Sequence, residues 1–388
     1  MYQRNFVPME HKRFYTLYQT KDGIDLLKDQ GMVPYYMGKL GYESHFISFI
    51  KPDPQDIFQK EVPELILDTL EDNGKLPKYP PLLMAYKDVF RFIYQNRKQI
   101  DIFNPYYIKH SILYGMFYKL VRPKGLLYVK LDMDPIQCER ELKQPFNFIR
   151  KFVYGCYLRY IVDKITVEST TGEKFLQKHY NIDGSKLLYI PNGIDDRYLA
   201  HVPVEPFDKK ENIILTVGRI GTFQKNTEML LAACKRICWR DDWVLYVVGP
   251  YTEEFKEKIV EFYRETNLQD RVVFMGSIYD KRELSRLYNR AKIFCLTSRY
   301  ESFGIVCVEA QSYGEYFIST PIVTANDFIP NEKVGKIVNT ADELAIQINT
   351  LIDNPHLMED AYPEILHHAQ QYRWSTICEK LNRFLQER

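Results

Sequence analysis

The sequence predicts an α/β protein made of two Rossmann-like, doubly wound domains. The chain has 388 residues, which is enough for two domains of roughly 150 to 200 residues that each bury a core. Its second half alternates short apolar runs with helical patterns, and this spacing favours a parallel sheet with helices on both faces. Its first half opens with a strand, a glycine-containing turn and a helix, which is how a doubly wound unit begins.

The first strand is expected at 14–18, followed by a turn at 28–31 and a helix at 32–40. In a doubly wound domain the first turn faces the ligand crevice. Asp29, Gln30 and Gly31 are therefore candidates for the acceptor side of a reaction, with an ordinary connecting turn as the alternative.

The strand expected at 126–131 ends in Lys130 and Leu131, and Asp132 follows it. Acids at the carboxyl end of a central strand lie where open α/β sheets hold their ligands. This places Lys130 on the acceptor side and makes Asp132 a candidate catalytic residue, although strand-end acids also cap the next element. The other strands expected in this half lie at 45–50, 164–168 and 187–190.

Residues 143–163 interleave Arg150, Lys151 and Arg159 with aromatic and aliphatic side chains. The wider region 87–163 carries 14 Lys and Arg against 7 Asp and Glu. Two interpretations remain open. The segment lies on an anionic membrane with its apolar side down, or it is a core helix with a basic outer rim.

The domain boundary is expected after the 187–190 strand, where an Asn192-Gly193 turn leads into the polar segment 196–211. We divide the chain into residues 1–196 and 197–374. In the second domain, strands are expected at 213–217, 244–248, 272–275, 293–296 and 317–319. Parallel strands end at one edge, which brings together the turns at Gly218, Gly249 and Gly276.

Two cations follow the first strand of this domain, Arg219 immediately and Lys225 six residues later. Fixed cations over a glycine-rich backbone match the charge of a diphosphate. For either residue alone, a solvated surface position is the commoner explanation.

The stretch 293–314, IFCLTSRYESFGIVCVEAQSYG, has the pattern of a strand, a polar loop and a helix start. Glu301 and Glu309 are eight residues apart, which is about 80° out of phase on one helix. We therefore expect one carboxylate in the loop and the other on the helix, both facing a ligand. The backbone N–H groups of Phe303, Gly304 and Ile305 would form a helix N-terminus suited to phosphate.

Composition excludes other classes. The net charge is +1, so no global field attracts nucleic acid. The seven cysteines are scattered without metal-site spacing, which indicates reduced thiols and a cytoplasmic protein. Neither a secretion signal nor a membrane span is predicted, and peripheral contact at the inner face of an anionic membrane through 143–163 is the open alternative.

These motifs resemble a known family. GRIGTFQK at 218–225, the loop around Gly276 and ESFGIVCVEA at 301–310 are similar to the signature of retaining, GT-B-fold glycosyltransferases of family 4. The resemblance runs from about residue 164 to 374. It implies two domains facing a central cleft, with 1–196 binding the acceptor, 197–374 binding a nucleotide sugar, and a helix at 375–388 packing back on the first domain.

By this resemblance, Arg219 and Lys225 hold the donor diphosphate, Glu309 the ribose hydroxyls and Glu301 the transferred sugar. The backbone near Gly276 and Ile278 meets the nucleobase. The other donor-binding positions expected at this edge are Gly218, Gly249, Ser302, Phe303, Gly304 and Ile305.

The implied activity is metal-independent, retaining transfer of a hexose, from a UDP-sugar first and GDP-mannose second. The acceptor would be a glycan, a glycolipid or a lipid-linked molecule in surface polysaccharide or glycoconjugate biosynthesis. No cofactor and no metal site is expected. The rival readings are a catalytically silent partner subunit and a nucleotide-sugar epimerase on the same fold; a dinucleotide dehydrogenase is disfavoured because no GxGxxG follows the first strand.

The sequence also departs from the family pattern. Asn226 follows the lysine where glycine is usual, and Asp29-Gln30-Gly31 stands where a Gly-Gly pair is common. Leu131-Asp132 occupies the strand end that often holds a histidine.

Overall fold

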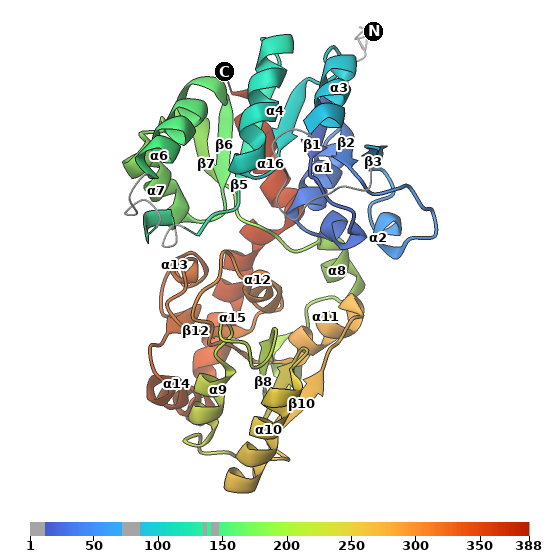
Figure 1. Cartoon of the computed structure of the whole chain (residues 1–388). Coiled ribbons are helices and arrows are strands. Elements are labelled where there is room, and N and C mark those ends of the chain that lie inside the picture. The colour runs from blue at the N-terminus through green and yellow to red at the C-terminus, as the bar shows by residue number, and fades with distance from the viewer. Residues whose placement is uncertain (1–11, 72–85, 135–137, 141–146, 388) are drawn as a thin grey trace, which may run out of the picture.

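The computed structural model describes residues 12–71, 86–134, 138–140 and 147–387, which fold into two lobes (Figure 1). Within these ranges the N-terminal lobe holds a seven-stranded sheet in the order β3-β2-β1-β4-β5-β6-β7, paired in parallel throughout. Its strands are β1 Arg13–Leu17, β2 Glu43–Ser48, β3 Ile66–Thr69, β4 Ile102–Pro105, β5 Leu126–Leu131, β6 Lys164–Val167 and β7 Leu187–Tyr189.

Helices cover both faces of this sheet, because strands buried on both sides need an apolar layer against each face. One core cluster packs Tyr114 and Tyr118 against Phe103, and the other packs Met32 and Val33 against Phe14. The N-terminal helices are α1 Asp29–Lys39, α2 Ile57–Lys60, α3 Tyr86–Asn96, α4 Ile108–Val121, α6 Asn147–Cys156 with a π-helical extension Tyr157–Ile161, and α7 Thr170–Tyr180.

The described part of the C-terminal lobe holds a six-stranded parallel sheet in the order β10-β9-β8-β11-β12-β13. This order reverses direction at β8, as in the first lobe at β1, and the reversal defines a doubly wound sheet. Its strands are β8 Ile213–Val217, β9 Val244–Val248, β10 Val272–Gly276, β11 Ile293–Leu296, β12 Tyr316–Ser319 and β13 Gly335–Ile337.

The helices of the second lobe also form two layers, each with its own core cluster. They are α8 Asp196–His201, α9 Thr227–Cys234, α10 Glu253–Thr266, α11 Lys281–Arg290, α12 Ile305–Ser312, α13 Ala325–Phe328, α14 Ala341–Asp353 and α15 His356–Ala369, and they are followed by α16 Trp374–Gln386. The prediction of two doubly wound α/β domains is confirmed.

Four local features differ from the predictions. The expected turn at 28–31 belongs mostly to α1, which begins at Asp29. The helix can start there because Gly31 has no side chain: a Cβ would lie 2.3 Å from the carbonyl oxygen of Leu26. The strands β3 and β13 were missed because they are short edge strands, of four and three residues, whose sequences lack a clear apolar pattern. The central strand β4 was also missed, because it has only four residues and ends in Asn104 and Pro105.

The last helix, α16, crosses back to the first lobe. Its residues Trp374, Ile377 and Leu381 share a core cluster with Phe14 and Met32. Burying an apolar face against another domain is what holds such a helix in place.

The carboxyl ends of the two sheets face each other across the domain boundary. Thr170 begins α7 shortly after the end of β6, and its backbone N–H donates at 3.1 Å to Oδ2 of Asp327, which lies in α13 after β12. The Thr170 hydroxyl donates to the other oxygen of the same carboxylate. Loops at this edge of both sheets therefore lie where a doubly wound protein binds its ligands.

Candidate active site at the domain boundary

Three glycines bring the strand ends of the C-terminal sheet together. Gly218 N–H donates to Val248 O at 2.9 Å, and Gly249 N–H donates to Gly276 O at 2.8 Å. A Cβ on Gly249 would lie 1.7 Å from the oxygen of Gly218, so only glycine permits this approach. The loops after β8, β9 and β10 consequently share one edge.

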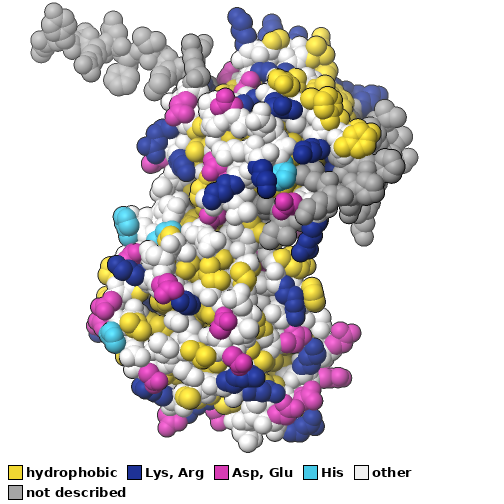
Figure 2. Space-filling view, turned by 90° about the vertical axis from the view of Figure 1, so that its left-hand side faces the viewer, with side chains coloured by type: hydrophobic (Ala, Val, Ile, Leu, Met, Phe, Trp, Pro, Cys, Tyr) yellow, Lys and Arg dark blue, Asp and Glu magenta, His cyan; other side chains and the backbone are white. Residues whose placement is uncertain are grey.

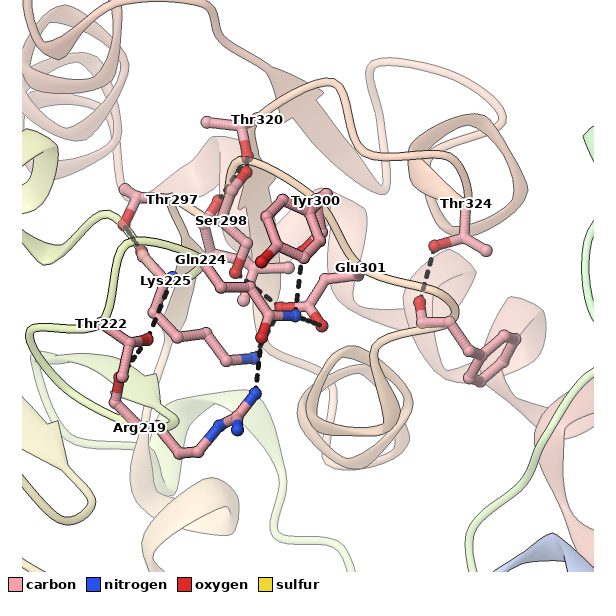
Figure 3. A network of polar contacts seen from close by, with 12 residues as sticks. Arg219, Thr222, Gln224, Lys225, Thr297, Ser298, Tyr300, Glu301, Thr320 and Thr324 are labelled. Atoms are coloured by element: carbon pink, nitrogen blue, oxygen red, sulfur yellow. Dashed lines mark hydrogen bonds and ion pairs between the residues drawn. The ribbon is translucent and has the colours of Figure 1, made fainter. Parts of the chain in front are cut away.

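Lys225 and Glu301 form an ion pair at this edge (Figure 3). Lys225 precedes α9, while Glu301 lies in the loop after β11. The Lys225 Nζ to Glu301 Oε1 distance is 2.5 Å, and Ser298 Oγ donates to the same oxygen at 2.6 Å. Their side chains are only 15% and 9% exposed, so the pair is shielded enough for its charges to matter.

Gln224 connects this pair to Arg219. Its Nε2 donates to Glu301 Oε2 at 3.2 Å and to the carbonyl of Tyr300 at 3.1 Å. Its Oε1 accepts from Arg219 Nη2 at 2.5 Å. Sequence reasoning missed this bridge, although Gln224 lies within the GRIGTFQK motif.

Threonine hydroxyls fix the loop that carries Glu301. Thr320 Oγ1 donates to Ser298 O at 2.5 Å, and Thr324 Oγ1 donates to Phe303 O at 2.6 Å (Figure 3). Phe303 is 3% exposed and packs edge-on against Phe328. Phe303 therefore anchors the loop with its side chain, while its backbone leads into α12.

Gly304 begins α12 with a left-handed backbone, φ 97° and ψ 64°. Glycine adopts this conformation without the steric cost that a Cβ imposes. The first N–H groups of a helix have no intrahelical acceptor, and they carry partial positive charge. The amino end of α12, at Ile305, follows directly on the loop that holds Glu301.

Glu309 lies on α12, as expected, with two partners of its own. Lys281 Nζ is 3.1 Å from Oε1, and the Tyr288 hydroxyl donates to Oε2 at 3.0 Å. The nearby carboxylate raises the pKa of Lys281, whereas burial, with Glu309 second, raises that of Tyr288. Sequence reasoning identified neither partner.

The charges of both glutamates act on one buried thiol. Burial raises the pKa of Cys307, and Glu301 and Glu309 both raise it further. Gly276 has a φ of 71°, and no atom lies within 4 Å of the position of its absent Cβ. Ile278, just beyond it, packs partly buried against the core cluster that contains Phe303.

A second group of charges lies in the N-terminal lobe around Lys130. The Lys130 Nζ is completely buried and lies 3.1 Å from Asp29 Oδ2, 2.9 Å from Glu168 Oε1 and 2.8 Å from Asn192 Oδ1. The Tyr106 hydroxyl also donates to Asp29 Oδ2, at 2.9 Å. These partners come from four separate segments. Sequence reasoning assigned no role to Glu168 or Tyr106, and it identified Asn192 only as part of the turn at the domain boundary.

The network contains more acid than base. Burial would lower the pKa of Lys130, but Glu168 and Asp29 raise it. Burial raises the pKa of Glu168 to about 8; Lys130 opposes this shift, and Asp132 adds to it. The pKa of Asp132 is raised by burial and then by the charge of Asp29.

The predicted residues thus fall into two groups. Arg219, Lys225 and Glu301 meet within one hydrogen-bonded cluster, and Gly218 lies beneath it, since a Cβ there would be 3.1 Å from Lys225 Cε. Ser302 is an exposed member of the same loop. On the other lobe, Asp29 and Lys130 belong to the buried network, and Gln30 lies beside it in the first turn of α1, 4% exposed.

Solved structures share this architecture. A glycosyltransferase from Rickettsia africae matches with a TM-score of 0.73 at 17% identity, covering 97% of this chain and 98% of that one. The Anabaena protein HepE, solved in complex with UDP, matches with a TM-score of 0.71 at 15% identity, covering 96% and 99%. The fold is therefore the two-domain GT-B fold, with a Rossmann-like sheet in each domain.

Sequence comparisons agree with the motifs. Residues 200–365 match the family model described as glycosyl transferases group 1. The C-terminal domain is therefore similar to this family, as the motifs predicted. The amylovoran biosynthesis glycosyltransferase AmsD of Erwinia amylovora is 25% identical over 291 residues, covering 69% of this chain and 79% of that protein.

A D-inositol 3-phosphate glycosyltransferase of Rhodococcus jostii is 25% identical over 239 residues. That match covers 56% of this chain and 51% of the relative. The chain thus spans about half the length of this curated relative.

Proposed function

We propose that this protein is a retaining glycosyltransferase that transfers a sugar from a nucleoside diphosphate sugar to a glycan or lipid-linked acceptor. The observation that carries the proposal is the shielded Lys225–Glu301 pair, joined to Arg219 through Gln224. A diphosphate entering this edge would offer Lys225 and Arg219 the charge-assisted partners that these cations prefer.

The chemistry requires a stabilised leaving group. As the bond from the anomeric carbon to the diphosphate breaks, negative charge develops on the phosphate oxygens. Lys225, Arg219 and the amino end of α12 supply positive potential at fixed positions, which lowers the barrier without metal assistance. Glu301, released from Lys225, would then orient the hydroxyls of the sugar.

We assign retention of configuration to attack by an acceptor hydroxyl on the face from which the diphosphate leaves. The new bond to the anomeric carbon replaces the bond to the diphosphate, and the departing phosphate oxygen takes the proton of the hydroxyl. Double displacement would need a carboxylate placed as in retaining hydrolases, whereas Glu301, after Lys225 turns to the diphosphate, would still be held by Ser298 and Gln224. Glu309 would bind the ribose, with Lys281 and Tyr288 holding it in position. The open space beside Gly276 would admit the base.

A panel of UDP-, GDP- and ADP-sugars tests the donor. We expect one sugar nucleotide to raise the melting temperature and to release its nucleoside diphosphate slowly by hydrolysis. The UDP bound by the Anabaena relative makes UDP-sugars the first choice. A silent partner subunit would release no nucleotide, and an epimerase would yield an isomeric nucleotide sugar, which mass analysis combined with chromatography detects.

We also propose that the protein rests on an anionic membrane through α6 and its π-helical extension. Phe148, Ile149, Phe152 and Tyr160 are 57 to 73% exposed, and Figure 2 shows hydrophobic side chains gathered at the upper right of the N-terminal lobe beside Lys and Arg side chains. Such a surface is costly in water and suits the headgroup boundary of a bilayer.

Helix α4 extends this surface. Leu113, Met116 and Leu120 recur on one side of the helix and are 39 to 76% exposed. The two elements lie side by side, because the Tyr157 hydroxyl donates to Ser111 O at 2.9 Å. We call these seven exposed side chains of α4, α6 and the extension the α4–α6 face. No helix within the described residues has the length and apolar content needed to span a bilayer.

A further inference from the structure

A groove of about 930 Å³ opens at the far end of the N-terminal lobe. Its wall includes Ile102, Leu126, Lys164 and Lys186, which stand at or just before the amino ends of β4, β5, β6 and β7. Amino ends of parallel strands lie on the sheet edge opposite to the carboxyl ends. The groove is therefore separate from the candidate active site.

The groove is strongly basic. Three carboxylates line it, from Asp101, Asp163 and Glu387. Against these stand six cations, Lys12, Lys119, Arg122, Lys124, Lys164 and Lys186. Three positive charges remain in excess, although the whole chain has a net charge of only +1. The local field is thus much stronger than the global one.

Only part of this charge is matched by acids. Lys119 pairs with Asp163 at 2.9 Å and Arg122 with Asp101 at 3.0 Å. Lys186 Nζ instead donates to the carbonyl of Arg159 at 2.8 Å. Burial lowers the pKa of Lys186, and Lys119 lowers it further against the opposing effect of Asp163 and Asp183. A bound anion would compensate for the burial of this ammonium group.

The groove borders the α4–α6 face. Tyr160 lines the groove and is also 73% exposed on that face. Leu120, 76% exposed, lies between the groove residues Lys119 and Arg122 in the sequence of α4. The apolar α4–α6 face and the basic groove are therefore adjacent. An anionic lipid has the matching arrangement, since its apolar acyl chains adjoin a charged headgroup.

We propose that this groove binds the phosphate of an anionic lipid headgroup while the α4–α6 face lies on the bilayer. The inference rests on the membrane contact proposed above and adds the chemistry that anchors it. Lysine ammonium groups bind a phosphate as compact point charges. A soluble phosphate would leave the adjoining apolar side chains in water, and this favours the lipid as the source.

The test is flotation of the full chain with vesicles of phosphatidylcholine, with and without phosphatidylglycerol. We compare Lys124→Ala/Lys186→Ala with a control of equal charge, Lys256→Ala/Lys333→Ala, whose lysines are exposed on the other lobe. Each basic residue at an anionic surface changes partitioning about fivefold. The groove variant should therefore lose about 25-fold in binding to anionic vesicles, with binding to phosphatidylcholine unchanged.

A second variant, with a single exposed substitution, keeps the test valid if the double variant fails to fold. Lys124→Glu reverses a charge at an exposed position and should weaken binding to anionic vesicles by more than removal of that single charge. If both groove variants bind anionic vesicles as the control does, the proposal is overturned. A further outcome would also overturn the proposal. Inorganic phosphate or glycerol phosphate would raise the melting temperature of the wild type, but the wild type would bind neither kind of vesicle. The groove would then be a site for a soluble anion.

Donor hydrolysis without vesicles separates this inference from the enzyme activity. If the wild-type chain shows no preference for anionic vesicles but still releases nucleotide, only the groove proposal is overturned. Binding to anionic vesicles by a protein that hydrolyses no donor would support the groove and contradict the proposed transferase.

Discussion

The two lobes hold their charged groups in opposite ways. In the C-terminal lobe, Lys225 and Glu301 keep 15% and 9% of their side chains exposed and sit on loops. In the N-terminal lobe, Lys130 is 0% exposed, with Asp29 at 8% and Glu168 at 3%. Charges on accessible loops can exchange one partner for a ligand, whereas charges in a closed network cannot do so without exposing the core.

We infer from this difference that the C-terminal pair binds ligand and that the N-terminal network supports the fold. Lys225 can leave Glu301 and bind a diphosphate, and only their one ion pair is lost. The N-terminal network fixes the ends of β5 and β6 and the first turn of α1 relative to each other through Lys130. Perturbing the first group should change turnover, and perturbing the second should change stability.

The largest effect is expected from Lys130→Met. The substitution keeps the length of the side chain but leaves Asp29 and Glu168 buried without their cation, and breaking a buried pair in this way costs about 3 to 5 kcal/mol. Urea denaturation measures the loss. Lys39→Met is the control, because Lys39 forms an exposed ion pair with Glu64 worth about 0 to 1 kcal/mol. Equal losses in the two variants would show that the network does not support the fold.

Lys225→Ala and Glu301→Ala should each lower turnover at least ~100-fold, the scale for losing one preorganised contact to the transition state. Because the two side chains touch, the double variant should lose less than the product of the single effects. Steady-state kinetics on the identified donor measures all three variants. Lys258→Ala, which removes an exposed lysine paired with Glu228, should leave turnover unchanged. Near-normal turnover in both single variants would refute the site.

Glu168→Gln should change how the free energy of unfolding depends on pH. A carboxyl whose pKa is raised to about 8 on folding stabilises the fold below its unfolded pKa of about 4.3, and this contribution is lost as pH rises toward 8. The slope approaches about 1.4 kcal/mol per pH unit. Glutamine mimics the protonated acid, so the stability of the variant relative to the wild type should rise between about pH 5 and pH 8 and level off above pH 8. A constant difference across that range would mean that Glu168 is ionised throughout.

The same contrast explains what the sequence could predict. Arg219, Lys225, Glu301 and Glu309 occupy two short motifs beside strand ends, so strand patterns and spacing were enough to bring them to one edge. Gln224 was missed although it is adjacent to Lys225, because an amide that bridges two charges has no sequence signature of its own.

The network around Lys130 could not be predicted because its members are far apart in the chain. Glu168 is 38 residues from Lys130 and Asp29 is 101 residues away. Strand-end position alone identified Lys130 and Asp132, but the depth of burial depends on how α1 packs. The helix α1 can start at Asp29 because Gly31 lies close to the backbone of Leu26, and no local sequence pattern reveals this contact.

The smallest effect is expected at Asn226, where the family usually has glycine. Asn226 has φ 49° and ψ 45°, a left-handed conformation that asparagine tolerates better than other side chains. Asn226→Gly should therefore change the free energy of unfolding by only a few tenths of a kcal/mol, about the cost of one cap exchange. Asn226→Val places a β-branched side chain in that region and should cost about 1 to 2 kcal/mol. Thermal denaturation distinguishes the two, and a valine variant as stable as the glycine variant would mean that the loop before α9 has an alternative backbone.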